Sequence, residues 1–340
     1  MRDAQDIHKD SLVIDSHNDS TVGHIRRGNV GFMGEISEER RLRGGAISFL
    51  REYVDPKNSP LQLNIPRMRQ GKIDAAFFAI DVTRAWDNHL LYALDGLAFL
   101  KQEIALHNDK IEIALKSGDI LSARKHGKLA AILAVENSDA LHRSVSIIDS
   151  LYDIGVRTMT LTHSPRSFAG DGCEVEGGSG LTPFGRDVVD AMNQCGMLID
   201  VSHLNDPGFW DVLNRSKQPV IASHSCCRQL CGHPRNLTDE QLLALREKGG
   251  VIGLTFVPQF LSDKDPSLSH LIDHIEHAIS ICGATNVGLG SDFDGGGTLL
   301  DSAADFPRIT EELVERGLDE ESLKNILGGN HLRLLEQVIG

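Results

Sequence analysis

Polar side chains that can bind metal or move protons follow six aliphatic segments of the chain. These residues are His17 and Asp19 after LVIDS, Glu136 after AAILAV, His163 after TMTLT, His203 after MLIDVS, His224 after PVIAS and Asp292 after VGLGS. A single histidine at such a position is commonly an ordinary structural side chain with hydrogen-bonding neighbours. Six recurrences in one chain are poorly explained in that way, so the pattern indicates a shared site.

The side chains form a mixed set of nitrogen and oxygen ligands. His17 and Asp19 lie two residues apart, so an extended backbone points both to the same side. Because no thiolate accompanies them, the set favours Zn²⁺ or another divalent transition metal. Four histidines, two aspartates and one glutamate exceed what one tetrahedral ion needs. Two ions that share a carboxylate would use them better; such pairs lie ~3.5–4 Å apart, activate a bridging water and polarise a scissile carbonyl.

The aliphatic segments are themselves predicted strands of a parallel sheet. Eight of them, separated by amphipathic segments of helical period, lie at residues 12–15, 75–80, 130–135, 158–162, 197–201, 220–222, 251–256 and 287–290. Strands that alternate with helices imply parallel pairing, and eight of them predict an α/β fold, a closed (β/α)8 TIM barrel that forms one domain over residues 1–340. The C-terminal ends of barrel strands open on one face, so residues far apart in sequence converge there.

The predicted helices cover residues 87–115, 140–151, 182–195, 206–216, 238–248 and 271–281. Thr182 before Pro183, and Thr238 with Gln241 three residues later, are typical of helix N-termini. Residues 28–70 are irregular and predict an elaborated segment after the first strand, and the glycine-rich residues 172–180 predict a mobile loop on the catalytic face. Two doubly wound domains are the alternative fold, but no linker divides the chain.

The overall composition limits the partners of the protein. Lys and Arg number 34 against 48 Asp and Glu, and the net charge of −14 would repel a phosphate backbone, so nucleic acid is not an expected partner. No segment approaches the ~20 apolar residues of a membrane span, and the first residues lack the apolar core of a signal peptide. The six cysteines form no disulfide framework, which is typical of a reducing compartment, and we expect a cytoplasmic protein.

Two further groups of potential ligands have simpler interpretations. A cysteine cluster lacks a second Cys/His pair at zinc-finger spacing; it consists of Cys226, Cys227 and Cys231. Three histidines fall on one face of a predicted helix, where we expect a solvated surface or one that faces a second copy in a homodimer, rather than a metal site. They are His270, His274 and His277.

Longer motifs connect the strand-end residues. They are IDSHND, TLTHS, GLTPFGRDVVDAMNQCGMLIDVSH, ASHS, HPRNLTDEQL, KGGVIGLTF, VGLGSDFDG and GGNHLRLLE, which run from residue 14 to about residue 336. In content and order these motifs resemble the membrane (renal) dipeptidase family of the amidohydrolase superfamily. The resemblance implies zinc-dependent hydrolysis of the peptide bond of dipeptides, by a water that bridges two metal ions.

The resemblance also implies a role for each metal-binding residue. His17 and Asp19 would bind one zinc ion, His203 and His224 would bind the other, and Glu136 would bridge the two. The implied cofactors are therefore two Zn²⁺ ions per chain.

Three residues would act on the substrate if the resemblance holds. Asp292 would take a proton from the bridging water and pass it to the leaving amine. His163 would contact the substrate and stabilise the tetrahedral oxyanion. Arg235, in HPRN, would hold the free carboxylate of the dipeptide as a planar fork. This grip would explain a preference for dipeptides over longer chains.

One departure from the family lies beside the bridging glutamate. Family members usually carry Gly-Gly there, where this chain has Asn137 and Ser138, so the pocket could differ in shape. Two other functions stay open: another amidohydrolase reaction on the same ions, such as lactam hydrolysis or deamination, and a metal-binding protein without activity. The presence of Asp292 argues against a protein without activity. Arg235 argues against deamination, because the nucleobase that a deaminase acts on offers no carboxylate. The side-chain and L or D preference for the substrate stays open.

Overall fold

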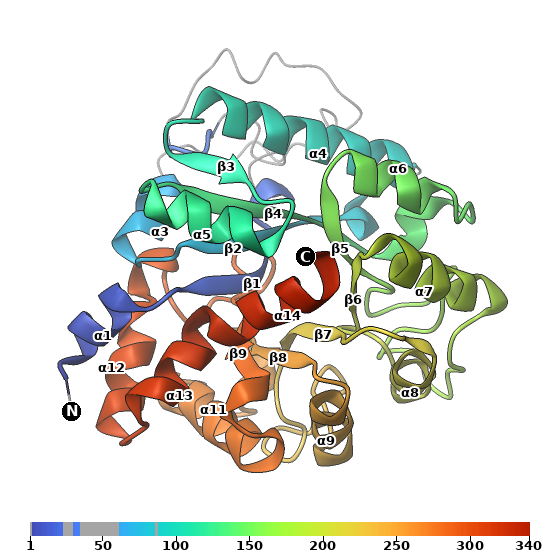
Figure 1. The fold of residues 1–340 in the computed structure, drawn as a ribbon. Coiled ribbons are helices and arrows are strands. Elements are labelled where there is room, and N and C mark those ends of the chain that lie inside the picture. Colours follow the sequence, from blue (N-terminus) through green and yellow to red (C-terminus); the bar gives the residue numbers. More distant parts are fainter. Residues whose placement is uncertain (1, 23–29, 35–60, 86–87) are drawn as a thin grey trace.

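Eight parallel strands close into a barrel, which confirms the predicted TIM-barrel fold (Figure 1). The computed structural model describes residues 2–22, 30–34, 61–85 and 88–340. The ring closes where β9 pairs with β1 through Leu289 and Asp15. In barrel order the strands are β1 (Ile14–Asn18), β2 (Ala75–Asp81), β4 (Leu129–Glu136), β5 (Val156–Thr160), β6 (Leu198–Asp200), β7 (Ile221–Ser225), β8 (Val251–Leu254) and β9 (Val287–Leu289).

A ninth strand, β3 (Ile111–Ile113), lies in a segment for which the sequence predicts helix. The single helix predicted at residues 87–115 is wrong in its last third: α4 (His89–Leu106) is followed by a turn and then by β3. The polar residues 107–110 interrupt the helical pattern, and the β-branched residues at both ends of β3 favour an extended backbone. β3 pairs with residues 129–131 of β4, whereas β5 pairs with residues 133–136 of that strand. The barrel therefore closes without β3.

The prediction of one helix at residues 140–151 is also wrong. The segment forms a 3₁₀ turn, η4 (Ser138–Leu141), and then α6 (Ile147–Asp153). His142 and Arg143 between them adopt φ values of 48° and 67°. A right-handed helix requires negative φ, so these two residues end the turn and force the helix to start again.

The other four predicted helices are confirmed, and so are the two predicted N-caps. Thr182 accepts a hydrogen bond from the backbone N–H of Gly185 at the start of α7 (Pro183–Cys195). Thr238 and Gln241 form the predicted capping box at α9 (Asp239–Glu247). The other α-helices of the described residues are α1 (Ala4–Asp10), α3 (Ile65–Gln70), α5 (Ser117–Lys125), α8 (Asp206–Arg215), α10 (Pro258–Leu261), α11 (Leu268–Cys282), α12 (Pro307–Glu315), α13 (Glu320–Lys324) and α14 (Asn330–Ile339).

Most of the elaborated segment expected at residues 28–70 lies outside the described residues; its described part includes α3. Within the described ranges, no helix combines the length and the apolar character needed to cross a bilayer.

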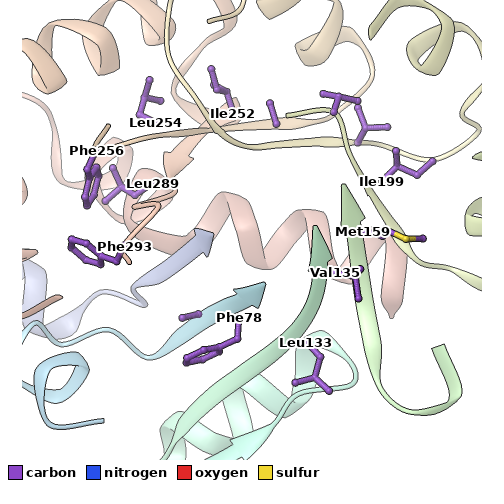
Figure 2. Close-up of a cluster of buried hydrophobic side chains, with 14 of the residues drawn as sticks. Phe78, Leu133, Val135, Met159, Ile199, Ile252, Leu254, Phe256, Leu289 and Phe293 are labelled. Atoms are coloured by element: carbon purple, nitrogen blue, oxygen red, sulfur yellow. The ribbon is translucent and has the colours of Figure 1, made fainter. Parts of the chain in front are cut away.

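Alternation along the strands divides the apolar side chains between two cores. In β4, Ala130 and Ile132 belong to a cluster that includes side chains from other barrel strands and α14, whereas Ala131, Leu133 and Val135 belong to the larger core shared with the surrounding helices. Figure 2 shows part of this larger core, with side chains from β2, β4, β5, β6, β8 and β9. α14 contacts β1, β6, β8 and β9 and lies across the barrel in Figure 1. Aliphatic side chains and α14 therefore fill one end of the barrel and leave the polar strand ends at the other.

The histidines on α11 do not form the surface expected from the sequence. His274 is buried, where its Nδ1 accepts from the N–H of Cys227 at 3.0 Å and its Nε2 donates to a backbone carbonyl. His277 pairs with Asp239 of α9 at 2.8 Å, and His270 is a half-buried member of the capping box of α11. The expectation of a solvated or oligomer-facing position is therefore wrong for the buried His274, whereas His270 and His277 are partly exposed.

His331 of α14 gives the stability of the fold a dependence on pH. Its ring is fully buried, its Nε2–H donates to the carbonyl of Leu289 at 3.2 Å, and its Nδ1 has no partner in the described part of the chain. Burial lowers the pKa of His331 from 6.5 to about 4. Between pH 6.5 and pH 4 the unfolded chain binds a proton at this histidine that the folded protein does not bind. The free energy of unfolding is therefore highest above pH 6.5 and decreases as the pH falls towards 4.

We therefore expect the free energy of unfolding to fall by about 2 kcal/mol more between pH 7.5 and pH 5 in the wild type than in His331→Gln. The glutamine keeps an amide N–H for the Leu289 carbonyl and does not titrate. Urea unfolding of both proteins at the two pH values measures the difference. Equal losses in the two proteins would show that His331 does not titrate in this range.

Candidate active site

The strand-end residues identified in the sequence converge at the C-terminal mouth of the barrel, around the carboxylate of Glu136. Oε1 of Glu136 lies 2.9 Å from His203 Nε2 and 3.6 Å from His224 Nε2, and Oε2 lies 3.7 Å from His17 Nε2. The Nε2 atoms of His203 and His224 are 2.8 Å apart. All four side chains are buried. One carboxylate thus faces three imidazoles that come from distant parts of the sequence.

A second group adjoins the first through His17. His17, Asp19 and Asp292 place potential ligand atoms within 4.8 Å of one another. His17 Nε2 and Asp19 Oδ1 are buried and have no hydrogen-bond partner among the described residues. Buried polar atoms without partners are costly, and a cation between them would satisfy both. This set of nitrogen and oxygen donors therefore fits divalent metal ions.

Local irregularities of the sheet aim two of these histidines into the site. The pairing register of β1 against β2 shifts around His17, and that of β7 against β8 shifts around His224. Such irregularities turn a side chain away from the face that strict alternation would give it. The rings of His17 and His224 stack with their centroids 3.7 Å apart. The bulges therefore bring the two imidazoles together beside Glu136.

Burial and mutual charge shift the pKa values of these groups. Burial lowers the pKa of His203 and His224, which favours the neutral imidazole that offers a lone pair to a metal. Burial also raises the pKa of Asp292 to about 7. For His17, burial acts to lower the pKa, but the Glu136 carboxylate outweighs it and raises the pKa to about 10. The carboxylates therefore favour positive charge in the site, and a bound metal ion would supply such charge.

Asp292 is held in the site by its backbone and by a glycine. Its N–H donates to the carbonyl of His17 at 2.9 Å, and its own carbonyl accepts from the N–H groups of residues 295–297. A Cβ on Gly295 would come within 2.1 Å of Asp19 Oδ2 and 2.3 Å of Asp292 Oδ1. Only glycine leaves room for these two carboxylates to lie side by side. The GSDFDGGG motif therefore shapes the mouth of the barrel around Asp292.

Arg235 is a buried cation without a carboxylate partner among the described residues. It is 4% exposed, it donates to the carbonyl of His224 at 2.9 Å, and its Nε has no partner in those residues. Its guanidinium lies 5.4 Å from the ring centroid of Phe260. A guanidinium with unused donors is suited to a planar anion such as a carboxylate.

His163 lies at the same mouth and is partly exposed. Its ring stacks on that of His203 with centroids 4.1 Å apart. A nitrogen of His163 lies within 4.8 Å of carboxylate oxygens of Asp81 and Glu136. His163 is thus close to the candidate metal ligands and open on one side, as a group that contacts substrate must be.

The structure adds two buried carboxylates that the sequence analysis missed. Asp81 ends β2 beside Glu136 and His163, and Asp200 ends β6 close to His17 and His224. Asp81 follows the run AAFFAI, so the rule that identified the other strand-end residues could have found it. Asp200 lies inside the run MLIDVS, where no sequence signal distinguishes it.

Asn137 and Ser138, at the position of the family's two glycines, fit the backbone in different ways. Asn137 has a φ of 77°, in the region that favours glycine, and its Oδ1 accepts from the N–H of Asp139 at 3.1 Å. Ser138 Oγ donates to the carbonyl of Leu161 at 2.6 Å. The backbone at residue 137 therefore keeps the conformation that glycine prefers, and both side chains form hydrogen bonds with nearby backbone groups.

We expect Asn137→Ala to lower the free energy of unfolding by about 1–3 kcal/mol, because alanine neither tolerates positive φ nor caps the following turn. Asn137→Gly should change it by less than about 1 kcal/mol, since relief of strain offsets the lost cap. Urea unfolding of the two variants makes the comparison. A glycine variant as unstable as the alanine variant would show that φ is not the constraint at this position.

The chain is similar to known peptidases over nearly its whole length. Residues 1–339 match the family described as "Membrane dipeptidase (Peptidase family M19)". The chain is 31% identical to dipeptidase verJ of Clonostachys rogersoniana, over 81% of this chain and 75% of that protein, and 30% identical to dipeptidase 3 of Mus musculus, over 82% and 58%. A metallo peptidase structure from Rhodobacter sphaeroides, liganded with a phosphinate mimic of the dipeptide L-Ala-D-Ala, superposes with a TM-score of 0.84 at 25% identity, over 97% of this chain and all of that one.

The closed parallel barrel and the cluster of potential ligands at its strand ends define the protein as a TIM barrel with a candidate metal site. The chain belongs to the membrane dipeptidase family, peptidase family M19.

Proposed function

We propose that this protein is a zinc-dependent dipeptidase that cleaves the peptide bond of dipeptides at a site for two metal ions. One observation carries the proposal: one oxygen of Glu136 faces His17, and the other faces His203 and His224. Family membership supports a dipeptide as substrate. The R. sphaeroides relative supports it too, because its ligand mimics a dipeptide. Zinc is favoured by a donor set of imidazoles and carboxylates without a thiolate.

The metal-binding roles follow from the two groups around Glu136. His17 and Asp19 would hold one ion, His203 and His224 would hold the second, and Glu136 would contact both. When bound, the ions supply an activated water and polarise the scissile carbonyl.

The remaining chemistry belongs to three other side chains. Asp292 accepts a proton from the attacking water and returns it to the leaving nitrogen, a role suited to a carboxyl group whose pKa is raised to about 7. A ring N–H of His163 donates to the carbonyl oxygen as negative charge develops on it. Arg235 holds the C-terminal carboxylate and so fixes the distance between that carboxylate and the bond that is cleaved.

A screen of dipeptides in both stereochemical series, on zinc-loaded protein, tests the function. We expect hydrolysis of free dipeptides and little or none of tripeptides, because the Arg235 grip leaves room for one residue after the scissile bond. The panel should include a lactam that carries a carboxylate, since Arg235 would hold it equally well. Turnover of the lactam alone, with no dipeptide cleaved, would replace peptide hydrolysis by lactam hydrolysis on the same site.

Replacement of Arg235 by lysine tests the carboxylate grip. Lysine keeps the charge but removes the bidentate fork, so Arg235→Lys should lower kcat/KM for a dipeptide by roughly 10–100-fold, the equivalent of about 1.5–3 kcal/mol for a hydrogen bond to a charged group. Amidation of the C-terminus of the substrate should then harm the wild type far more than the variant. Equal losses on amidation would mean that Arg235 does not hold this carboxylate.

A further inference from the structure

Asp200 receives four hydrogen bonds beneath the candidate metal site. Its Oδ1 accepts the backbone N–H groups of Ser202 and Ser223, each at 3.0 Å. Its Oδ2 accepts the hydroxyl groups of Thr160 at 2.8 Å and Ser223 at 2.5 Å. The side chain is 2% exposed. A carboxylate offers about four lone-pair positions, so this one is saturated by donors from β5, the end of β6 and β7.

This saturation settles the direction of the hydrogen bonds at Ser223. A serine hydroxyl has one proton, and Ser223 gives it to Asp200. Towards its other neighbours Ser223 Oγ can therefore only accept. Those neighbours include Nδ1 of His224 at 2.7 Å and Nδ1 of His17 at 3.4 Å. A ring nitrogen can bond to such an oxygen only if that nitrogen carries a hydrogen.

We propose that Asp200 is a positioning residue that acts through Ser223 to hold His224 with the hydrogen on Nδ1 and the lone pair of Nε2 free for a metal ion. Nε2 of His224 is the atom that faces Glu136. Ser223 Oγ also faces Nδ1 of His17, so one serine oxygen contacts a histidine from each of the two groups in the site. The role in metal binding rests on the proposed function, whereas the tautomer of His224 does not depend on it.

The neighbouring geometry separates this role from direct metal binding by Asp200. Asp200, His17 and His224 do lie within 4.8 Å of one another. All four lone-pair positions of Asp200 are nevertheless engaged by donors from the protein, which leaves none for a cation. Outer partners of this kind commonly fix the tautomer and the orientation of ligand histidines, and their loss costs about 10–100-fold in metal affinity.

Asp200→Asn reverses the relay at almost constant volume. The amide oxygen of the asparagine would accept the hydrogen bonds of the two backbone N–H groups. In the opposite orientation its NH₂ group, itself a donor, would face these donors. The NH₂ group would then donate to Ser223 Oγ, whose proton would turn to His224 Nδ1 and drive the hydrogen of that ring to Nε2. Ser223→Ala removes the relay without reversing it. Thr160→Val is the matched control, since it removes a donor to Asp200 that touches neither histidine.

The test begins with metal-free protein, in which no metal imposes the tautomer. ¹⁵N-histidine spectra at pH 7.5, with the His224 signals assigned by their loss in His224→Asn, should show His224 protonated on Nδ1 in the wild type and in Thr160→Val. Asp200→Asn should show protonation on Nε2, and Ser223→Ala a mixture. A wild type protonated on Nε2, or a Ser223→Ala variant that keeps the Nδ1 form unchanged, would overturn the relay even if Asp200→Asn fails to fold.

Zinc affinity, measured by competition with a chelator, supplies the second readout. We expect Asp200→Asn to bind zinc about 10–100-fold more weakly than the wild type, Ser223→Ala to lie between, and Thr160→Val to match the wild type. Equal affinity in Asp200→Asn and Thr160→Val would overturn the positioning role. A wild type that binds no zinc, but shows the Nδ1 tautomer, would contradict the proposed function and support the relay.

Discussion

Asp292→Asn is expected to lower kcat by a factor of roughly 10²–10⁴, while the protein folds and keeps its metal. Asparagine is nearly the same size as aspartate but cannot carry the proton between the attacking water and the leaving nitrogen. The loop should persist, because the hydrogen bonds to His17 and from residues 295–297 use the backbone of residue 292 and not its side chain. The loss should therefore appear in turnover and not in stability.

Asp294→Asn is the matched control for this loss. Asp294 lies in the same loop, has a similar positive φ and ties the loop to Ser20 and Gln62 by hydrogen bonds. Its replacement should lower stability but change kcat by less than about tenfold. Metal content, unfolding and kcat are measured on the same preparations. Near-normal turnover in fully metallated Asp292→Asn would remove Asp292 from the mechanism.

Glu136→Gln is expected to weaken metal binding and to lower kcat/KM by more than about 10²-fold, the upper end of the loss caused by removal of an outer partner. Glu136 contacts three histidines at the centre of the site, and a neutral amide cannot share two negative oxygens between cations. At least one of the two expected zinc equivalents should be lost on purification, as elemental analysis would show.

Asp206→Asn is the control for the loss of one negative charge. Asp206 forms a bidentate pair with Arg228 at the start of α8, and Asp206→Asn should retain both ions and its activity. If Glu136→Gln keeps two zinc equivalents and wild-type turnover, Glu136 does not bridge the ions.

The sequence predicts the barrel well because buried parallel strands are continuous aliphatic runs. All eight predicted segments overlap barrel strands, although β1 extends three residues further than predicted, so that His17 lies within the strand. The prediction of one helix at residues 87–115 is wrong at Ile111–Ile113, which form β3. A helical pattern averaged over the whole segment conceals this short change. The break at His142 fails for a related reason, since nothing in the composition signals two successive positive φ values.

The sequence predicts the strand-end residues that meet around Glu136, but it misses Asp81 and Asp200 and does not predict the geometry of the site. Strand ends of a parallel barrel share one face, so the convergence around Glu136 follows from the fold alone. The bulges at His17 and His224 depend on pairing register, which the sequence does not display. The relay from Asp200 to Ser223 depends on contacts among β5, β6 and β7, and only their three-dimensional packing reveals it.

The most direct test of the central claim is a zinc titration of metal-free protein, followed by the rate of hydrolysis of a free dipeptide. We predict no measurable hydrolysis without metal and an activity that rises to its maximum at two zinc equivalents per chain. A maximum at one equivalent would contradict the pair of ions bridged by Glu136. Full activity in the metal-free protein, or no hydrolysis of any dipeptide at saturating zinc, would contradict the assignment as a zinc dipeptidase.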